Sequence, residues 1–556
     1  MNMPAPIAEP SSAIHLQPGY VLTIALLAFL LPLVSIEYDV LRYTGGTFSY
    51  PLDDSFIHLA VAKTLAFHHV WGISKYAFAS ASSSILYPIL IAVLFFIFGA
   101  HTIVGFIINV LAGITLLIAI QRWLIRQGIT PMAQLLILLA VIFLTPLPVI
   151  VVCGMEHTLQ FLFCFLFITR FSVELADRPA DFSRTLYIYG VLVAATRYEG
   201  AALIIIACLL AMWKRRFIPA LQLGIYSLLP IFIFGFISLG KGSYFLPNSV
   251  LLKSGAPPMT FDGLYHFFTQ EVYDKLTFSI TGYNIVAAQR LLLLLPITWL
   301  LFIRPLKAMP AYRYMLLLLM AAVLVHVFFA GYVNFPRYEA WLIGCSVAVS
   351  GMLTAKYGSS LLKRDNIVTK WIAGLTAALI FLPLIIRSVN ALGDIGQACI
   401  NIYEQQYQMG QMLHRYYNKT PVAIGDIGAV SYFTEGKDLD LVGLANIDVA
   451  RSKKNNYYTP QFMNKLTKDE GVRIAICYDY YTMAGLRQYW TKVATWTIPD
   501  NVTCGDATVA IYAVDSSDAP DLKKNLVEFQ PHLPQDVEVH YYYDVPDTAG
   551  KRTVMR

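Results

Sequence analysis

Two adjacent carboxylates, Asp53 and Asp54, lie in the segment LDDSFIH, residues 52–58, at the start of an amphipathic run from Phe56 to Val70. Paired acids can share catalytic work, because one can take a proton from an attacking hydroxyl while the other orients that hydroxyl or holds a cation. A second interpretation needs no catalysis, since acidic residues at the start of a helix stabilise its dipole. We expect the run to form a helix that lies along the membrane surface.

Three basic residues lie in segments that proline or glycine interrupts: Arg197 in TRYEG, Lys253 in PNSVLLKSG and Arg337 in NFPRYE. Guanidinium groups fork onto phosphate oxygens in charge-assisted hydrogen bonds, so these cations suit a phosphate or diphosphate. A simpler interpretation is that Arg197 pairs with Glu199, and Arg337 with Glu339, as internal ion pairs.

Glu156 and His157 follow Gly154 in the segment GMEHT, at the outer end of an apolar run. Both are as compatible with an ordinary loop as with a functional site. Hard divalent cations prefer carboxylate oxygens, so Asp54 and Glu156 are the candidate ligands if Mg²⁺ or Mn²⁺ binds. We do not expect an obligatory metal, because the basic side chains suffice to neutralise a monophosphate leaving group.

The composition indicates a protein that crosses a membrane many times. Of its 556 residues, 57% are hydrophobic and 14% are charged, whereas soluble domains carry about 25% charged residues. No tract rich in Lys or Arg suggests binding of nucleic acid. The seven cysteines show no metal-ligand spacing. Only Cys477 and Cys504 share the polar tail, where they could pair in an oxidising compartment.

Apolar runs long enough, or nearly so, to cross a bilayer predict spans near 21–36, 131–152, 157–173, 217–239, 289–303, 312–332, 338–356 and 371–388. For two further stretches the number of crossings is ambiguous, and the positive-inside rule decides it. With the basic clusters inside, 185–213 forms a hairpin with its apex at Thr196–Gly200. Stretch 85–120 then makes one net crossing, with a re-entrant or surface-lying half. The total is about eleven spans, with the N-terminus inside and the C-terminus outside.

This topology places every remaining polar cluster on the outer face, where we expect a single extracytoplasmic cavity. Ionisable residues in membrane segments are costly and are therefore candidates for function. The candidate substrate-binding residues of this face are His58, His157, Glu199, Asn248 and Glu339.

From about Asn390 the sequence becomes richer in charge and predicts a soluble α/β domain. TPVAIGDIGAVSYF, GVRIAICYDYY and ATVAIYAV are typical of short strands, and helices are expected around 394–418 and 459–470. We therefore divide the chain into a polytopic α-helical membrane domain, residues 1–389, whose first outer loop is 37–84, and a soluble domain, residues 390–556, outside the membrane.

Several segments resemble, in the same order, motifs of the polytopic GT-C glycosyltransferases. Asp53-Asp54-Ser-Phe-Ile-His-Leu-Ala, FHHVWGI and ASASSSILYPIL resemble the first outer loop of that superfamily. GMEH is similar to its Gly-Leu-Glu-Thr, TRYEGA to its Arg-Pro-Glu-Gly, and PNSVLLK to its Pro-Asn-Ser/Thr-x-x-x-Lys. GDIGAVSYF…DLDLVGLAN is similar to a segment that follows the membrane core in many bacterial members.

The resemblance implies a polyprenyl-phosphate or polyprenyl-diphosphate sugar as donor and a first-loop aspartate as base. It assigns the base to Asp53, a partner role to Asp54, a second acid to Glu156, and the lipid phosphate to Arg197, Lys253 and Arg337. His157 and Tyr198 depart from the common Thr and Pro of the motifs, which leaves the sugar and the acceptor open.

These observations favour an enzyme of the bacterial inner membrane that transfers a sugar to a hydroxyl of a glycan, lipid or protein, with inversion at the anomeric carbon. A transporter or flippase of lipid-linked sugars is one alternative, although such proteins usually show repeats and polar sites near the midplane. A ligase that moves whole glycans from a lipid diphosphate is another.

Labelling of single introduced cysteines tests this topology. A reagent that does not cross the membrane should label a cysteine placed after Asn390 in intact spheroplasts. It should label Arg216→Cys and Lys363→Cys only after permeabilisation, because both lie in basic loops. A tail that reacts only after permeabilisation would contradict both the orientation and the single outer cavity.

Overall fold

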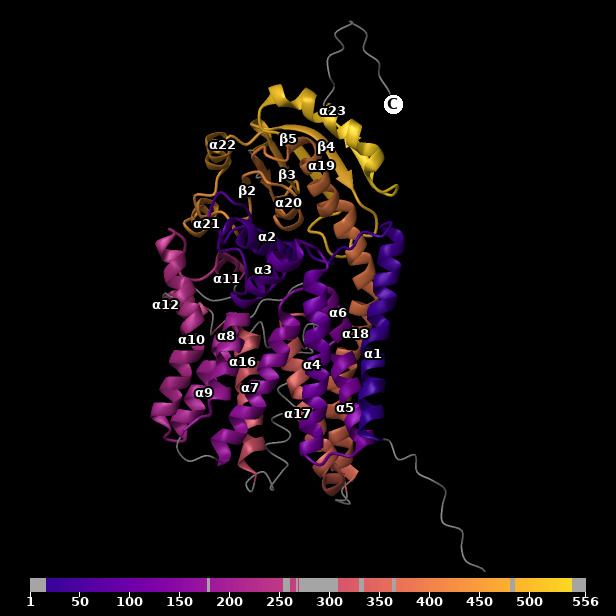
Figure 1. Ribbon diagram of the computed structural model, residues 1–556, viewed down its shortest axis with the longest axis vertical. Coiled ribbons are helices and arrows are strands. Elements are labelled where there is room, and N and C mark those ends of the chain that lie inside the picture. The colour runs from indigo at the N-terminus through magenta and orange to yellow at the C-terminus, as the bar shows by residue number, and fades with distance from the viewer. Residues whose placement is uncertain are drawn as a thin grey trace, which may run out of the picture.

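The structure is a computed structural model that describes residues 17–177, 181–253, 261–266, 269, 309–329, 335–362, 367–480 and 486–542. An upright helical bundle carries an α/β domain on one end, and short helices lie between the two parts (Figure 1). The chain begins its first helix at the opposite end of the bundle from the α/β domain (Figure 1).

Four helices among the described residues are long and apolar enough to cross a membrane: α1 (Pro18–Tyr43), α4 (Val104–Arg126), α7 (His157–Asp177) and α10 (Phe217–Gly240). On α10 the large side chains of Leu221, Ile225 and Phe236 are exposed by 60%, 55% and 65%. Apolar area of this extent is unfavourable in water and favourable against lipid chains. The chain is therefore a membrane protein.

The remaining bundle helices are α5 (Pro131–Leu144), α6 (Leu147–Val152), α8 (Arg184–Thr196), α9 (Gly200–Trp213), α16 (Pro310–Phe329) and α17 (Ala340–Leu362). The hairpin expected over 185–213 is confirmed as α8 and α9. The span expected over 131–152 consists of two helices, α5 and α6, because Pro146 has no amide hydrogen to continue α5. The span expected at 289–303 lies outside the described residues.

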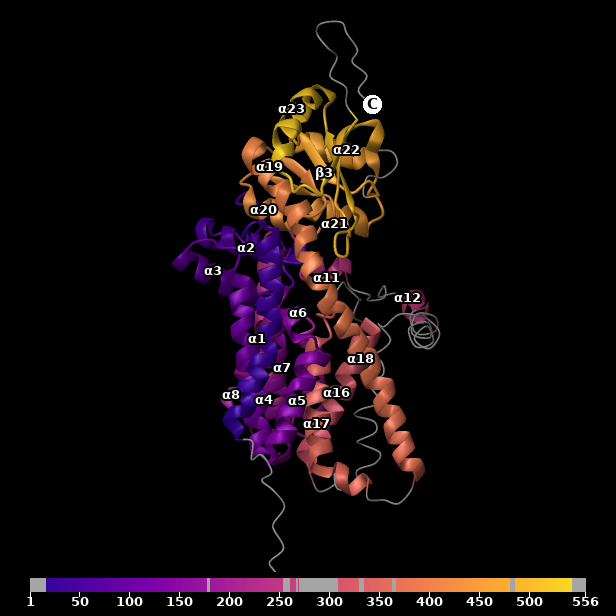
Figure 2. The same ribbon diagram turned by 90° about the vertical axis from the view of Figure 1, so that its right-hand side faces the viewer.

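A layer of short helices separates the bundle from the α/β domain: α2 (Asp53–His68), α3 (Leu86–Phe98) and α11 (Asn248–Lys253), with α12 (Phe261–His266) to one side (Figures 1 and 2). In the stretch 85–120, α3 lies across the end of the bundle, and α4 is the helix long and apolar enough to cross a membrane (Figure 2). The helix expected over Phe56–Val70 is confirmed as α2, and its place along the membrane surface stays a prediction. Most of its residues are buried, because α3 and the α/β domain cover it.

One helix joins the two parts of the molecule. α18 (Ile367–Ile402) runs from the far end of the bundle up to the α/β domain and continues through η4 (Tyr403–Tyr407) into α19 (Gln408–Tyr417) (Figure 2). The expected span 371–388 and the expected helix 394–418 are parts of this run. The proposed boundary at residue 390 therefore falls inside a continuous helix.

The α/β domain contains a six-stranded sheet in the order β2-β1-β3-β5-β4-β6. Its strands are β1 (Val422–Ile424), β2 (Asp438–Asp440), β3 (Ile474–Cys477), β4 (Thr491–Thr497), β5 (Thr508–Ala513) and β6 (Glu538–Tyr541). β1 pairs in parallel with β2 and β3, and the other pairs are antiparallel. Cys477 and Cys504 are both free thiols.

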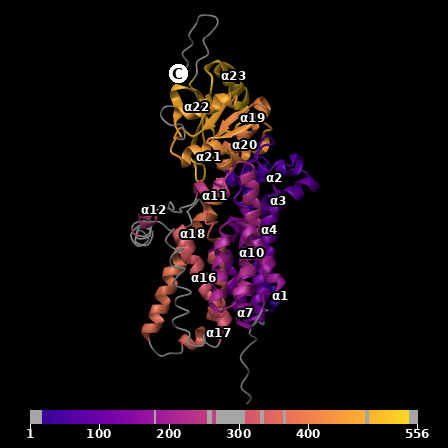
Figure 3. The same ribbon diagram turned by 90° about the vertical axis from the view of Figure 1, so that its left-hand side faces the viewer.

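Helices α20 (Gly428–Phe433), α21 (Ile447–Lys454), α22 (Pro460–Asp469) and α23 (Ala519–Phe529) complete the domain, with the short turns η5 (Leu486–Gln488), η6 (Ser516–Asp518) and η7 (Gln530–His532). The three segments expected as strands contain β1, β3 and β5. The end of the first of them, GAVSYF, is helical instead and forms α20. Figure 3 shows α20 and α21 on the side of the domain that faces the bundle.

Asp53 ties the α/β domain to the layer beneath it. Its Oδ2 accepts a hydrogen bond of 2.6 Å from the Gly428 amide, and its Oδ1 accepts one of 2.8 Å from the Ala429 amide. A Cβ on residue 428 would lie 2.0 Å from the main-chain oxygen of Asp53, so only glycine permits this approach. The start of α20 therefore rests directly on the start of α2.

A second acid, Asp426, lies near this contact and belongs to the α/β domain. Asp426 Oδ2 accepts hydrogen bonds of 2.6 Å from the Tyr478 hydroxyl and 2.8 Å from Gln406 Nε2. Burial, together with the charge of Asp426, raises the pKa of Asp53 to about 8, although the two amide hydrogen bonds oppose this shift. The protonated form of Asp53 is therefore favoured in the folded protein.

We expect Gly428→Ala to destabilise the junction, because the added methyl group would push α20 away from Asp53. Loss of two buried hydrogen bonds should lower the free energy of unfolding by about 1–3 kcal/mol, measured by thermal or denaturant unfolding in detergent. Gly396→Ala is the control, since a Cβ there meets nothing within 4 Å. Equal stabilities of the two variants would contradict the close contact.

We also expect stability to fall as the pH rises from about 4 to about 8 and to level off above that, because over this range the folded protein holds a proton on Asp53 that the unfolded chain has already released. Thermal unfolding between about pH 4 and about pH 9 measures this. Asp426→Asn should lessen the fall, since it removes a charge that raises the pKa of Asp53. An unchanged profile in that variant would exclude the interaction between the two acids.

Candidate active site

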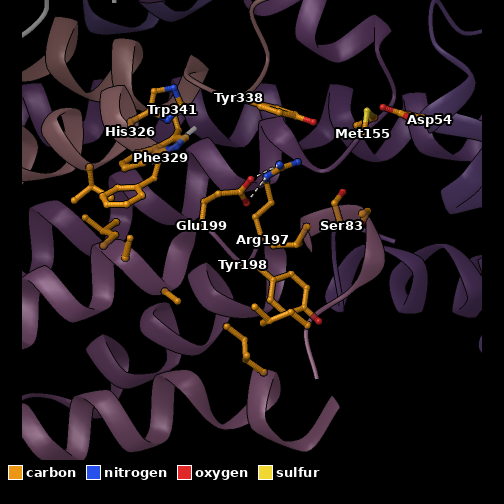
Figure 4. A pocket seen from close by; sticks show the side chains of 18 of the residues that line it. Asp54, Ser83, Met155, Arg197, Tyr198, Glu199, His326, Phe329, Tyr338 and Trp341 are labelled. Carbon is orange, nitrogen blue, oxygen red and sulfur yellow. Dashed lines mark hydrogen bonds and ion pairs between the residues drawn. The ribbon is translucent and has the colours of Figure 1, made fainter. Parts of the chain in front are cut away.

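A cavity of about 400 Å³ lies at the end of the bundle that carries the α/β domain. Its walls come from α2, the turn between α8 and α9, α9, α10, α16 and α17, and from Leu444 of the α/β domain. Apolar side chains of α9 and α16, such as Ile206 and Phe329, form much of the lining. In Figure 4, Asp54 lies at one end of the cavity, His326 lies at the other, and the pair of Arg197 and Glu199 lies between them.

The two adjacent acids of α2 face different parts of the molecule. Asp54 and His58 are one helical turn apart, so they share a face of α2, and both line the cavity. Asp53 does not line the cavity, because α20 binds both of its oxygens. The sequence places the two carboxylates side by side, but the fold separates their environments.

Glu156 is the centre of a buried polar cluster. Its Oε1 accepts hydrogen bonds from Arg197 Nη1 at 2.6 Å and from Ser83 Oγ at 2.7 Å, while Oε2 lies 3.0 Å from His58 Nε2. Burial alone would raise the pKa of Glu156, but His58 and Arg197 hold that pKa well below its usual range. Glu156 is therefore an ionised anchor for its neighbours rather than a group poised to take up a proton.

The turn that presents Glu156 depends on a glycine. Gly154 has a φ of +62°, and a Cβ there would lie 2.0 Å from the ring of Tyr50. Tyr87 donates a hydrogen bond of 2.6 Å to the Gly154 carbonyl and so holds the turn from the side of α3. The glycine of the GMEH segment is thus explained by backbone conformation and by close packing.

Arg197 connects the buried cluster to the cavity. Besides Glu156, it binds Glu199 through Nε at 3.1 Å and Nη2 at 2.7 Å, which confirms the expected internal pair. His157 Nε2 accepts a further contact of 3.3 Å from Nη1. The Arg197 side chain is only 3% exposed, whereas that of Glu199 is 45% exposed.

Arg337 does not form its expected pair. Its Nη2 donates a hydrogen bond of 2.8 Å to Asp54 Oδ2, and its Nη1 contacts the sulfur of Met155 at 3.1 Å. Glu339 binds Arg387 of α18 instead. The two charged residues of the NFPRYE segment therefore have different partners. Arg337 therefore holds the one acid of α2 that lines the cavity.

Tyr338 lies between the two arginines. The centre of its ring is 4.7 Å from Arg197 Cζ and 5.4 Å from Arg337 Cζ. A guanidinium at this range is attracted by the negative face of an aromatic ring. One tyrosine can therefore keep both cations beside the cavity, where Figure 4 shows it.

Four residues expected at the site line the cavity: Asp54, His58, Arg197 and Glu199. Glu156, His157 and Arg337 contact these four from behind. Asp53, Asn248 and Glu339 do not line the cavity, and Asn248 instead starts α11, with its amide bonded to the Ser80 carbonyl at 3.1 Å. Lys253 ends α11, and its side chain lies outside the described part of the chain.

The arrangement does not fit a divalent cation. Within the described residues no three His, Cys, Asp or Glu side chains gather as a metal-binding group. The expected ligands, Asp54 and Glu156, each bind an arginine, at 2.8 Å and 2.6 Å. A cation between them would meet guanidinium groups where it needs oxygen ligands.

Sequence reasoning missed several residues of the site: Ser83, Met155, His326 and Tyr338. A signal was available for His326, because an ionisable residue inside an expected span is a candidate for function. It was also available for Tyr338, which lies within the NFPRYE segment. The same signal was available for Met155, which lies within GMEHT. Ser83 is neither ionisable nor part of one of these polar clusters, and tertiary contacts bring it to the cavity.

Comparisons with known proteins show what this architecture is similar to. A family described as a domain of unknown function (DUF8728) matches residues 400–512, most of the α/β domain. No curated protein matches the chain. The crystal structure of ArnT from Cupriavidus metallidurans bound to undecaprenyl phosphate is 13% identical, with a TM-score of 0.50, and the match covers 89% of this chain and 98% of that one. The apo state of the same protein gives 14% identity, the same coverage and a TM-score of 0.49.

At this low identity the likeness to ArnT concerns the fold. It extends over the bundle and the α/β domain together, because it covers 89% of the chain. The expected architecture is therefore confirmed: this chain has a GT-C-like fold, with a polytopic helical bundle and a C-terminal α/β domain.

Proposed function

We propose that this protein is an integral membrane glycosyltransferase that moves a sugar from a polyprenyl-phosphate donor to a hydroxyl acceptor. The observation that carries this proposal is the meeting of Asp54, Arg197 and Arg337 at one cavity under the α/β domain. A base and two phosphate-binding cations are the groups that displacement at a sugar carbon needs. The GT-C-like fold supports the same reaction class.

The shape of the cavity suits a lipid-linked donor. Apolar side chains of α9 and α16, such as Leu203 and Phe329, line it. In Figure 4, Asp54 and Ser83 lie at the end of the cavity opposite Phe329. A prenyl chain would bury apolar area against the first group. Its phosphate would then meet the arginines, and the sugar would lie toward Asp54.

In the proposed reaction, Asp54 takes the proton of the acceptor hydroxyl as that oxygen attacks the anomeric carbon. The bond between this carbon and the phosphate oxygen breaks, and polyprenyl phosphate leaves with the electron pair of that bond. A single displacement of this kind inverts the anomeric configuration. Arg197 and Arg337 would stabilise the charge that develops on the leaving phosphate.

We propose Asp54, rather than Asp53, as the base. Asp54 lines the cavity with 23% of its side chain exposed, so an acceptor can reach it, whereas both oxygens of Asp53 are bound by α20. Asp54 also accepts a hydrogen bond from Arg337. A lipid phosphate that binds Arg337 would compete for this bond and leave the Asp54 oxygen available to a proton.

The sugar stays open. We propose that the acceptor, a glycan, a lipid or a protein, approaches from the extracytoplasmic side of the bacterial inner membrane. Lys253 is proposed as a third cation for the lipid phosphate, on the strength of the motif alone. We propose no obligatory metal, because arginines hold the two acids that would be its ligands.

We expect purified protein to consume a polyprenyl-phosphate sugar from a panel and to release polyprenyl phosphate. Asp54→Asn should bind the donor but lose about 10²–10⁴ in turnover, as is typical when a general base is removed. Arg337→Ala should raise the KM for the donor, because it loses a phosphate contact.

Asp53→Asn is the matched control, since it makes the same change one residue away. It should lower the melting temperature and cost less turnover than Asp54→Asn. Full turnover by Asp54→Asn together with its loss in Asp53→Asn would reverse the assignment of the base. Release of polyprenyl diphosphate would identify a glycan ligase, and movement of intact donor across vesicles without cleavage would identify a transporter.

A further inference from the structure

Four of the five N–H groups of the Arg197 guanidinium already have partners. Its Nε and Nη2 both bind Glu199, at 3.1 Å and 2.7 Å, and its Nη1 binds Glu156 at 2.6 Å and His157 at 3.3 Å. If Arg197 is to hold the phosphate of the proposed function through a parallel pair of N–H groups, one of these partners has to give way.

The two acids that bind Arg197 differ in how firmly they are held. Glu156 is completely buried, and Ser83 and His58 hold its oxygens as well. Glu199 is 45% exposed and lines the cavity, and both of its oxygens are satisfied by Arg197 (Figure 4). An ion pair that reaches solvent on one side, as this one does at Glu199, contributes less free energy than a fully buried pair, whose loss is costly. Glu199 is therefore the partner that can leave.

The edge of Arg197 that Glu199 occupies is the edge a phosphate would use. A guanidinium binds carboxylate and phosphate oxygens through the same pair of parallel N–H groups. Glu199 takes this position from the cavity side, and its carboxylate can turn outward into the open part of the cavity. A lipid phosphate that arrives along the cavity would meet the same two donors.

We propose that Glu199 is an internal substitute for the lipid phosphate: it occupies Arg197 in the empty protein, yields to the incoming phosphate, and returns to Arg197 as polyprenyl phosphate leaves. This inference rests on the proposed function and adds a role to a residue that was expected only to bind substrate. A substrate-binding residue strengthens the binding of the lipid. A residue that competes for Arg197 weakens it.

The two roles make opposite predictions for Glu199→Gln. We expect this variant to bind polyprenyl phosphate about threefold to fivefold more tightly than the native protein, since loss of an exposed ion pair is worth this much. Equilibrium binding of radiolabelled polyprenyl phosphate to protein in nanodiscs measures the change without any turnover. Glu156→Gln is the matched control on the same arginine, and we expect it to bind the lipid more weakly, because it loses the buried anchor of Arg197.

In an Arg197→Gln background, Glu199→Gln should have no further effect on binding, because the group for which Glu199 competes is gone. Melting temperatures show whether each variant is folded, and half-exposed Glu199 tolerates an isosteric change. Unchanged or weaker binding by Glu199→Gln, with native protein that binds the lipid, would overturn this inference alone. Native protein that binds no polyprenyl phosphate would overturn the proposed function and this inference with it.

Discussion

The first turn of α2 decides how the two parts of the molecule meet. Asp53 points up into the α/β domain and binds the start of α20, whereas Asp54 points into the cavity and binds Arg337. Both contacts depend on the position of one short helix. The base that we propose is therefore held in place by the same element that fastens the α/β domain to the bundle.

Buried charge explains the density of ion pairs around the cavity. An isolated charge in a low-dielectric interior is strongly unfavourable, so buried arginines are found with acids. Arg197 has Glu156 and Glu199, Arg337 has Asp54, and Arg387 has Glu339. In the proposed reaction, an anionic ligand that enters such a site replaces an acid already present. Charge balance would thus link the binding of the donor to the release of a carboxylate.

Periodicity and composition were sufficient to predict much of the fold. The long apolar helices, the hairpin of α8 and α9, and the strands β1, β3 and β5 follow from local patterns that water, lipid and the backbone impose. The differences lie where the backbone continues or breaks otherwise than local patterns indicate. Residues 371–418 form one long helical run rather than two separate helices, and α5 and α6 divide the stretch 131–152. Tertiary contacts also bury most of α2, because α3 and the α/β domain cover it.

The sequence by itself determined which residue types are present at the site, since clusters such as GMEHT and TRYEG interrupt apolar runs. It also predicted that these clusters share one face of the membrane domain. It could not determine their partners. Neighbours such as Asp53 and Asp54, or Arg337 and Glu339, look equivalent or paired in one dimension. Only the tertiary structure separated them, because adjacent side chains leave the backbone in different directions. Each side chain then meets its own opposite charge or amide donor, often hundreds of residues away in the sequence, and that partner fixes its role.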